Sequence, residues 1–151
     1  MSLVGIDCEM ARNSGTWGTP TGVAVGDIRD VVMDSQWAMA IFKKRGNRDA
    51  LTKPTIRTRV VTGTFEHAPG VTASDANFDA FNDAHEDRTQ LELFILNGPL
   101  ATSGSLGLHA HFYVSKWSRS EPLEDAVTYS FELSLAVDHA TSEAPEEHVT
   151  A

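Results

Sequence analysis

The segment VTYSFELSLAVD, residues 127–138, carries the strongest structural signal in the chain. Large apolar side chains alternate with polar ones along it, which is typical of a β-strand with one face in a core and the other in water. A register shift of one residue would turn every apolar side chain toward water. We therefore expect a strand whose inward positions are Val127, Tyr129, Phe131, Leu133, Leu135 and Val137.

Further strands are predicted on the N-terminal side of this segment. Alternation and β-branched residues indicate them over residues 28–33, 36–43, 56–67, 89–96 and 106–117. One helix is also predicted: Ser74 is suited to cap it, and Phe78, Phe81 and His85 follow at helical spacing. The pattern predicts a mostly β protein, an antiparallel β-sandwich or barrel with one α-helix packed on the side.

The length and the ends of the chain suggest its domain organisation. The 151 residues suit a single domain with a substantial core. Residues 1–22 contain several Gly and Pro residues without hydrophobic periodicity, which predicts an irregular N-terminal arm. Residues 139–151 contain one large aliphatic residue, Val149, and are predicted to be a disordered polar tail. The single β domain is then expected over residues 23–138.

Composition narrows the class of protein. A hydrophobic fraction of 41% and a charged fraction of 22% are ordinary for a globular protein. No apolar run approaches the roughly 20 residues that span a bilayer. The first ten residues do not resemble a secretory signal, so we expect an intracellular origin. The one cysteine, Cys8, cannot form an internal disulfide and has no Cys or His at metal-finger spacing.

Charge is unevenly distributed along the chain. The net charge of −9 argues against adhesion to nucleic acid, because such affinity depends on Lys and Arg neutralising phosphates. Seven of the twelve basic residues nevertheless lie between positions 43 and 59: Lys43, Lys44, Arg45, Arg48, Lys53, Arg57 and Arg59. Residues 44–54 are predicted to form a polar, basic loop, longer than an ordinary hairpin turn.

Residues 36–43 are predicted to be apolar on both faces of their strand. Trp37, Met39 and Ile41 alternate there with Ala38, Ala40 and Phe42. A strand of this kind is covered twice, by another sheet or by a partner chain. Residues 56–67 lack a cleanly apolar face as well. The patterns of these two strands indicate that they contact other subunits.

The sequence was searched for catalytic and metal-binding patterns. His109 and His111 alternate on one strand and could grip a metal ion, as in a cupin-like, metal-binding or ligand-binding β-barrel. No third ligand stands at a recognisable offset, since the next acid is Glu121, and the favoured interpretation is two polar histidines on the wet face of a half-buried strand. No nucleophile elbow, phosphate loop or dinucleotide motif is present. We therefore expect neither an enzyme nor a cofactor.

Two further segments are informative: WGTPTGVAVGDIRDVVMDSQW, residues 17–37, and FYVSKWSRSEPLEDAVTYSFELSLA, residues 112–136. Both resemble the tail tube proteins of long-tailed bacteriophages. The resemblance implies a virion protein that assembles in the host cytoplasm into hexameric rings, which stack into a tube through which DNA passes. It also implies tape measure, tail tip and tail terminator proteins as partners.

In that family a long loop reaches the adjacent ring, and residues 43–53 correspond to it in position. We expect the basic residues to meet acidic surface of a neighbouring subunit, with the helix at 75–87 as the candidate. The predicted subunit interface comprises Lys43, Lys44, Arg45, Arg48, Lys53, Arg57, Arg59, Asp75, Asp79 and Asp83.

Overall fold

The computed structural model describes residues 9–15, 21–98, 103–124, 127–136 and 146–149. In chain order its elements are β1 (Glu9–Asn13), β2 (Gly22–Ala24), β3 (Ile28–Phe42), β4 (Leu51–Glu66), α1 (Thr72–Glu86), β5 (Gln90–Leu96), β6 (Leu106–Ser120), β7 (Thr128–Ala136) and β8 (Glu146–Val149). None of the described helical residues form a helix long and apolar enough to cross a membrane.

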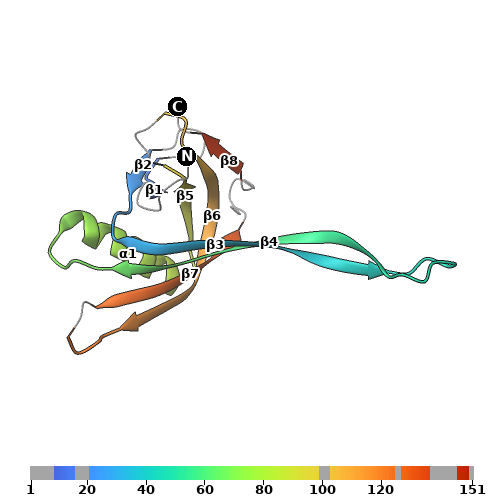
Figure 1. The fold of residues 1–151 in the computed structure, drawn as a ribbon. Coiled ribbons are helices and arrows are strands. Elements are labelled where there is room, and N and C mark those ends of the chain that lie inside the picture. Colours follow the sequence, from blue (N-terminus) through green and yellow to red (C-terminus); the bar gives the residue numbers. More distant parts are fainter. Residues whose placement is uncertain (1–8, 16–20, 99–102, 125–126, 137–145, 150–151) are drawn as a thin grey trace.

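The strands form one antiparallel sheet around a single main core. Their order is β2-β1-β5-β6-β7-β4-β3, and β8 pairs with the start of β6 beyond the end of β7. Met10 of β1 and Phe65 of β4 belong to one apolar cluster although their strands are far apart in this order, so the sheet is strongly curled. The helix packs against β5 and β6 (Figure 1). The predicted fold class, mostly antiparallel β with one helix on the side, is confirmed.

Aromatic side chains fill the space between α1 and the sheet. Phe65, Phe81 and Phe112 are fully buried. The Phe81 ring lies 5.9 Å from Phe65 and 5.6 Å from Phe131, and it stacks on Trp117 at 6.2 Å. The Phe81 ring thus contacts rings from three strands, β4, β6 and β7, and Phe78 of the same helix packs against Phe65, Trp117 and Tyr129 beside it.

The strand predicted from residues 127–138 is confirmed as β7 over its described length. Phe131 and Leu133 are buried, and Ser130, the residue before Phe131, is exposed. The strands predicted at 89–96 and 106–117 are confirmed as β5 and β6. Positions 137 and 138 lie outside the described residues.

The predicted start of the helix is wrong by one turn. Val71, and not Ser74, is the N-cap, and it makes no side-chain cap hydrogen bond. The Ser74 hydroxyl instead accepts a hydrogen bond of 3.0 Å from the Ala68 backbone N–H. Ser74 is buried, so it ties the preceding turn to the helix from inside the first turn.

Both predicted irregular ends contain strands. The arm at residues 1–22 includes β1, which pairs with β2 and β5, because Met10 and Ala11 face apolar clusters on opposite sides. The tail predicted to be disordered includes β8, whose backbone pairs with the free edge of β6. Residues 1–8, with Cys8, and residues 139–145 lie outside the described part of the chain.

The two short strands predicted at 28–33 and 36–43 are one strand, β3. Its ladder with β4 continues from Ile28 to Phe42, with irregularities after Arg29 and after Trp37. The predicted loop is also shorter, because β4 begins at Leu51. Pro54 lies within β4 next to the second irregularity, where a residue without an N–H is tolerated.

Candidate assembly surface

The outer halves of β3 and β4 form a hairpin that leaves the body of the protein. β4 pairs with β7 only from Val60 onward, so residues 51–59 pair with β3 alone. We call residues 35–59 the projecting hairpin. Figure 1 shows it extending away from the sheet and the helix. A two-stranded ribbon is marginally stable by itself in water, so a ribbon of this length indicates a partner.

The projecting hairpin and its base carry most of the exposed large apolar side chains of the described residues. The hairpin itself exposes Trp37 (49%), Met39 (52%), Ile41 (69%), Phe42 (49%) and Ile56 (69%). Val31, Val32 and Met33 at its base are also exposed. Exposed apolar side chains gathered on one element in this way indicate an interaction site.

Trp37 is held in place by neighbours on the opposite strand. The Arg57 guanidinium lies over the Trp37 ring at 5.9 Å, and Arg57 Nε donates a 2.7 Å hydrogen bond to Ser35 Oγ. Trp37 and Arg57 are directly paired across the ladder. A half-exposed Trp fixed in this way has the features of an interface anchor.

The predicted interface residues lie at two separate places. The tip, residues 43–50, is fully exposed and carries Lys43, Lys44, Arg45 and Arg48, while the other three basic residues lie along β4. Asp79 and Asp83 are exposed on α1, and Asp75 is half-buried because its carboxylate contacts His67 Nε2 at 2.7 Å. Figure 1 places α1 and the tip at opposite ends of the molecule. Within one chain these opposite charges therefore do not meet.

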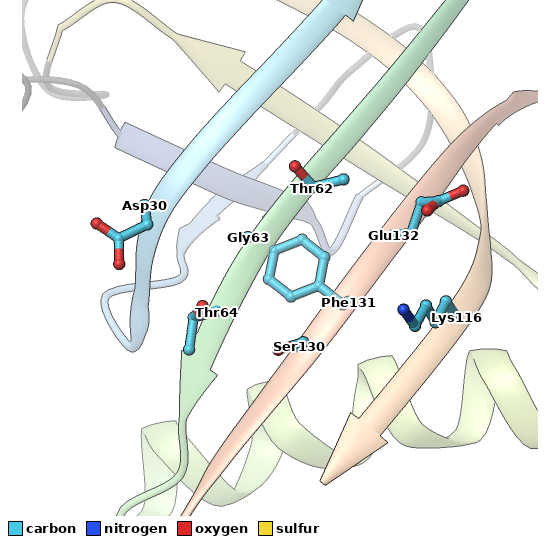
Figure 2. A pocket seen from close by; sticks show the side chains of 8 residues that line it. All are labelled: Asp30, Thr62, Gly63, Thr64, Lys116, Ser130, Phe131 and Glu132. Carbon is cyan, nitrogen blue, oxygen red and sulfur yellow. The ribbon is translucent and has the colours of Figure 1, made fainter. Parts of the chain in front are cut away.

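A shallow depression lies on the sheet face at the base of the hairpin. Its volume is about 270 Å³, and it is lined by Asp30, Thr62, Gly63, Thr64, Lys116, Ser130, Phe131 and Glu132. Figure 2 shows the Phe131 ring beside Gly63, where any larger residue would meet it: an added Cβ would lie 2.7 Å from Phe131 Cζ. Small-molecule sites are mostly apolar, and this lining is mostly hydroxyl and charged groups. We assign it no ligand.

The prediction that His109 and His111 lie on a wet face is wrong, because both are buried, at 1% and 8% exposure. His109 Nε2 donates to Glu92 Oε1 at 2.5 Å, and its ring stacks on Phe94 at 4.2 Å. Asn13 Nδ2 donates to the same Glu92 oxygen. No group of three potential metal ligands occurs among the described residues. The described residues therefore supply no third ligand for the metal-binding alternative, and the His109 ring is held by Glu92 and Phe94.

Glu92 is the residue that sequence reasoning missed. It lies 17 positions before His109, and the register of β5 with β6 places it opposite His111 and diagonal to His109. The available signal was the pair of adjacent strands at 89–96 and 106–117, whose antiparallel pairing brings these side chains to one face.

Replacing His109 with Leu is expected to lower the free energy of unfolding by about 1–3 kcal/mol, because a largely buried carboxylate loses a donor. Urea denaturation followed by circular dichroism measures the change. His109→Gln, which can still donate, serves as the matched control and should cost less. Equal losses in both variants would show that ring packing, and not the hydrogen bond, stabilises this site.

Comparison with known proteins supports the fold. No family model matches the sequence, and no curated protein matches it. Among solved structures, the SPP1 tail tube has a TM-score of 0.70 at 16% identity, over 89% of this chain and 76% of that one. The tail of an empty gene transfer agent particle has a TM-score of 0.65 at 10% identity, over 99% and 100%.

A third solved structure comes from a contractile system. The sheath–tube complex of the extracellular contractile injection system PVC has a TM-score of 0.65 at 10% identity, over 98% of this chain and 92% of that one. At such low identities the likeness establishes the fold. The chain has the fold seen in phage tail tubes and in related tubes.

Proposed function

We propose that this protein is a structural subunit of a bacteriophage tail tube, without enzymatic activity or cofactor. Copies would form rings that stack into a hollow tube through which DNA passes. One observation carries the proposal: the projecting hairpin exposes apolar and basic side chains along most of its length, and its residues pair with no other strand of the described chain. The likeness to tube proteins supports the same role.

The two charged regions suggest how rings stack. The basic tip and the acidic helix face lie at opposite ends of one subunit (Figure 1), so the tip of one copy can reach the helix of the next. Two different surfaces that fit each other on successive copies make a heterologous contact, which propagates into a filament. We propose that Lys43, Lys44, Arg45 and Arg48 face Asp79 and Asp83 of the neighbouring ring.

The acidic balance of the chain suits a channel for DNA. Because the subunit has a net charge of −9, its overall electrostatic interaction with DNA phosphates is repulsive. The basic residues are concentrated on the hairpin, where the proposed contacts between subunits would cover them. DNA would then pass without specific binding.

Ring size, partners and location follow from the same proposal. We propose six subunits per ring, as in the gene transfer agent tail that was refined with C6 symmetry. A tube of this kind needs a length-setting tape measure protein, a tip and a terminator. The assembled protein would reside in the virion after assembly in the host cytoplasm.

Electron microscopy of the concentrated protein tests the proposal directly. Negative-stain images should contain rings or hollow tubes of uniform diameter. A protein that stays monomeric at every concentration, also after addition of preformed tube fragments as seeds, would contradict the proposed function.

Reversing the charge of the tip is expected to raise the concentration needed for tube growth about tenfold or more, because several ion pairs become repulsive. The variant carries Lys43→Glu, Lys44→Glu, Arg45→Glu and Arg48→Glu, and sedimentation of tubes measures the effect. The matched variant Asp79→Lys with Asp83→Lys should show a similar defect. Growth of mixed tubes from the two reversed variants would identify the pairing, and unchanged growth of the tip variant would exclude it.

A further inference from the structure

The two faces of the projecting hairpin differ in the size of their apolar side chains. Alternation along β3 places Trp37, Met39 and Ile41 on one face, which we call the Trp37 face, and Ala38, Ala40 and Phe42 on the other, the Ala38 face. At the base of the hairpin, Met33 continues the Trp37 face and Val32 continues the Ala38 face. All eight are exposed. The centre of the Trp37 face is large and projecting, and the centre of the Ala38 face is small.

We infer that the hairpins of adjacent subunits in a ring pack face to face, with the Trp37 face of one copy on the Ala38 face of the next. The inference rests on the proposed function, and the occupant of each face is a second copy of this chain. It explains why a hairpin with no cover in its own chain is apolar on both sides.

The scarcity of other apolar surface indicates that hairpins cover one another. Outside β3 and β4, the exposed large apolar residues of the described chain are Val71, Leu106 and Leu123, which belong to three separate elements or turns. None of them forms a patch that could receive Trp37, Met39 and Ile41. The apolar complement that the described chain offers is therefore another copy of the hairpin.

Having two apolar faces determines the symmetry of the contact. A hairpin with one apolar face could bury it in a two-fold dimer. Here each hairpin needs two neighbours, one for each face. The same contact, the Trp37 face of one copy against the Ala38 face of the next, then repeats around the ring until it closes. Size also fits, because the Trp37 ring can lie where Ala38 and Ala40 leave room.

Charge at the base of the hairpin agrees with this arrangement. Arg59 pairs with Ser35 and therefore lies on the Trp37 face, whereas Asp34, the residue before Ser35 in β3, lies on the Ala38 face. Stacked hairpins in register would bring Arg59 of one copy near Asp34 of the next. Lys53, opposite Ala40, also lies on the Ala38 face, and its long side chain can extend to water.

Cross-linking between single-cysteine variants tests the packing. Cys8 is replaced by Ser, and Met39→Cys marks the Trp37 face while Ala40→Cys marks the Ala38 face. Each variant alone, and an equal mixture of both, is assembled and treated with a bis-maleimide that spans about 10 Å, the usual separation of stacked sheets. The expected result is covalent dimers in the mixture and none in either single variant.

Other outcomes overturn the inference. Dimers of Met39→Cys alone, or of Ala40→Cys alone, would indicate two-fold or edge-to-edge pairing of hairpins. Tubes that are visible in the microscope but give no cross-link in the mixture would leave the proposed function intact and reject the packing. A mixture of Met39→Cys with Leu123→Cys, an exposed position after β6 that takes no part in the proposed contacts, controls for random collision. Absence of both tubes and cross-links would count against the proposed function as well.

Discussion

Removing the projecting hairpin is expected to abolish tube formation while leaving the subunit folded. In this variant Asn-Gly replaces residues 36–58, so that the paired residues Ser35 and Arg59 flank a two-residue turn. The deleted residues pair only with each other and contribute nothing to the two apolar clusters. The thermal unfolding temperature should therefore change by less than about 4 °C, which corresponds to about 1 kcal/mol for a domain of this size.

Assembly should nevertheless be lost completely. The deletion removes Trp37 and the rest of the exposed apolar stripe, together with the basic tip. A few buried aromatic and apolar anchors supply most of the energy of a protein interface, so both the proposed ring contacts and the proposed stacking contacts disappear. Circular dichroism and analytical ultracentrifugation check the fold and the monomer, and electron microscopy checks for tubes.

A matched pair of triple variants tests whether assembly depends on the apolar side chains of the hairpin or only on the presence of the hairpin. Trp37→Ser, Met39→Ser and Ile41→Ser keep the hairpin and should also prevent assembly. Val71→Ser, Leu106→Ser and Leu123→Ser remove three exposed apolar residues elsewhere, at 53%, 49% and 99% exposure, and should leave assembly intact. Tubes formed by the deletion variant, or unfolding of that variant, would contradict our account of the hairpin.

Strands with one buried face could be predicted from the sequence because burial imposes a clear alternation. β7 is the best case, since Phe131 and Leu133 face the core while Ser130 faces water. The helix was predictable for the same reason, through Phe78, Phe81 and His85. Its first turn was not, because Ser74 bonds a neighbouring turn and thus acts through tertiary structure.

The hairpin was predictable in its chemistry and not in its shape. Apolar residues on both faces of positions 36–43 indicated a partner, and the exposure of these side chains agrees. Two strands were predicted, at 28–33 and 36–43, and the polar residues Asp34 and Ser35 lie between them. An uncovered ribbon imposes no pattern of burial on its residues, so polar positions occur within β3 without interrupting the ladder.

The histidines show where local pattern fails. His109 and His111 alternate with apolar residues, which normally indicates a wet face. β5 and β6 are instead covered on both sides: Leu93 faces the main core, and Phe94 packs with Ala11 and Leu96 in a second cluster. Glu92 supplies a hydrogen-bond partner for His109, so a polar ring is tolerated in that second layer.

Shortening Phe81 to Ala should cause the largest loss of stability, about 3–5 kcal/mol. Phe81 is fully buried, and its ring contacts Phe65, Phe131 and Trp117. Its removal leaves a cavity between α1 and the sheet, at the place where the helix is fixed to the core. Since a native domain is stable by roughly 5–15 kcal/mol, the loss would remove a large fraction of the total.

Chemical denaturation of Phe81→Ala and of Asp83→Ala, on the exposed face of the same helix, measures the difference. Asp83→Ala should change stability by no more than about 0.5 kcal/mol. A loss below about 1 kcal/mol for Phe81→Ala would mean that the surrounding side chains collapse into the space and that the helix is held by other contacts. The core variant and the hairpin variant also separate an effect on folding from an effect on assembly. Phe81→Ala should reduce tube formation in proportion to the unfolded fraction. The triple variant Trp37→Ser, Met39→Ser and Ile41→Ser should prevent tube formation while the subunit stays fully folded.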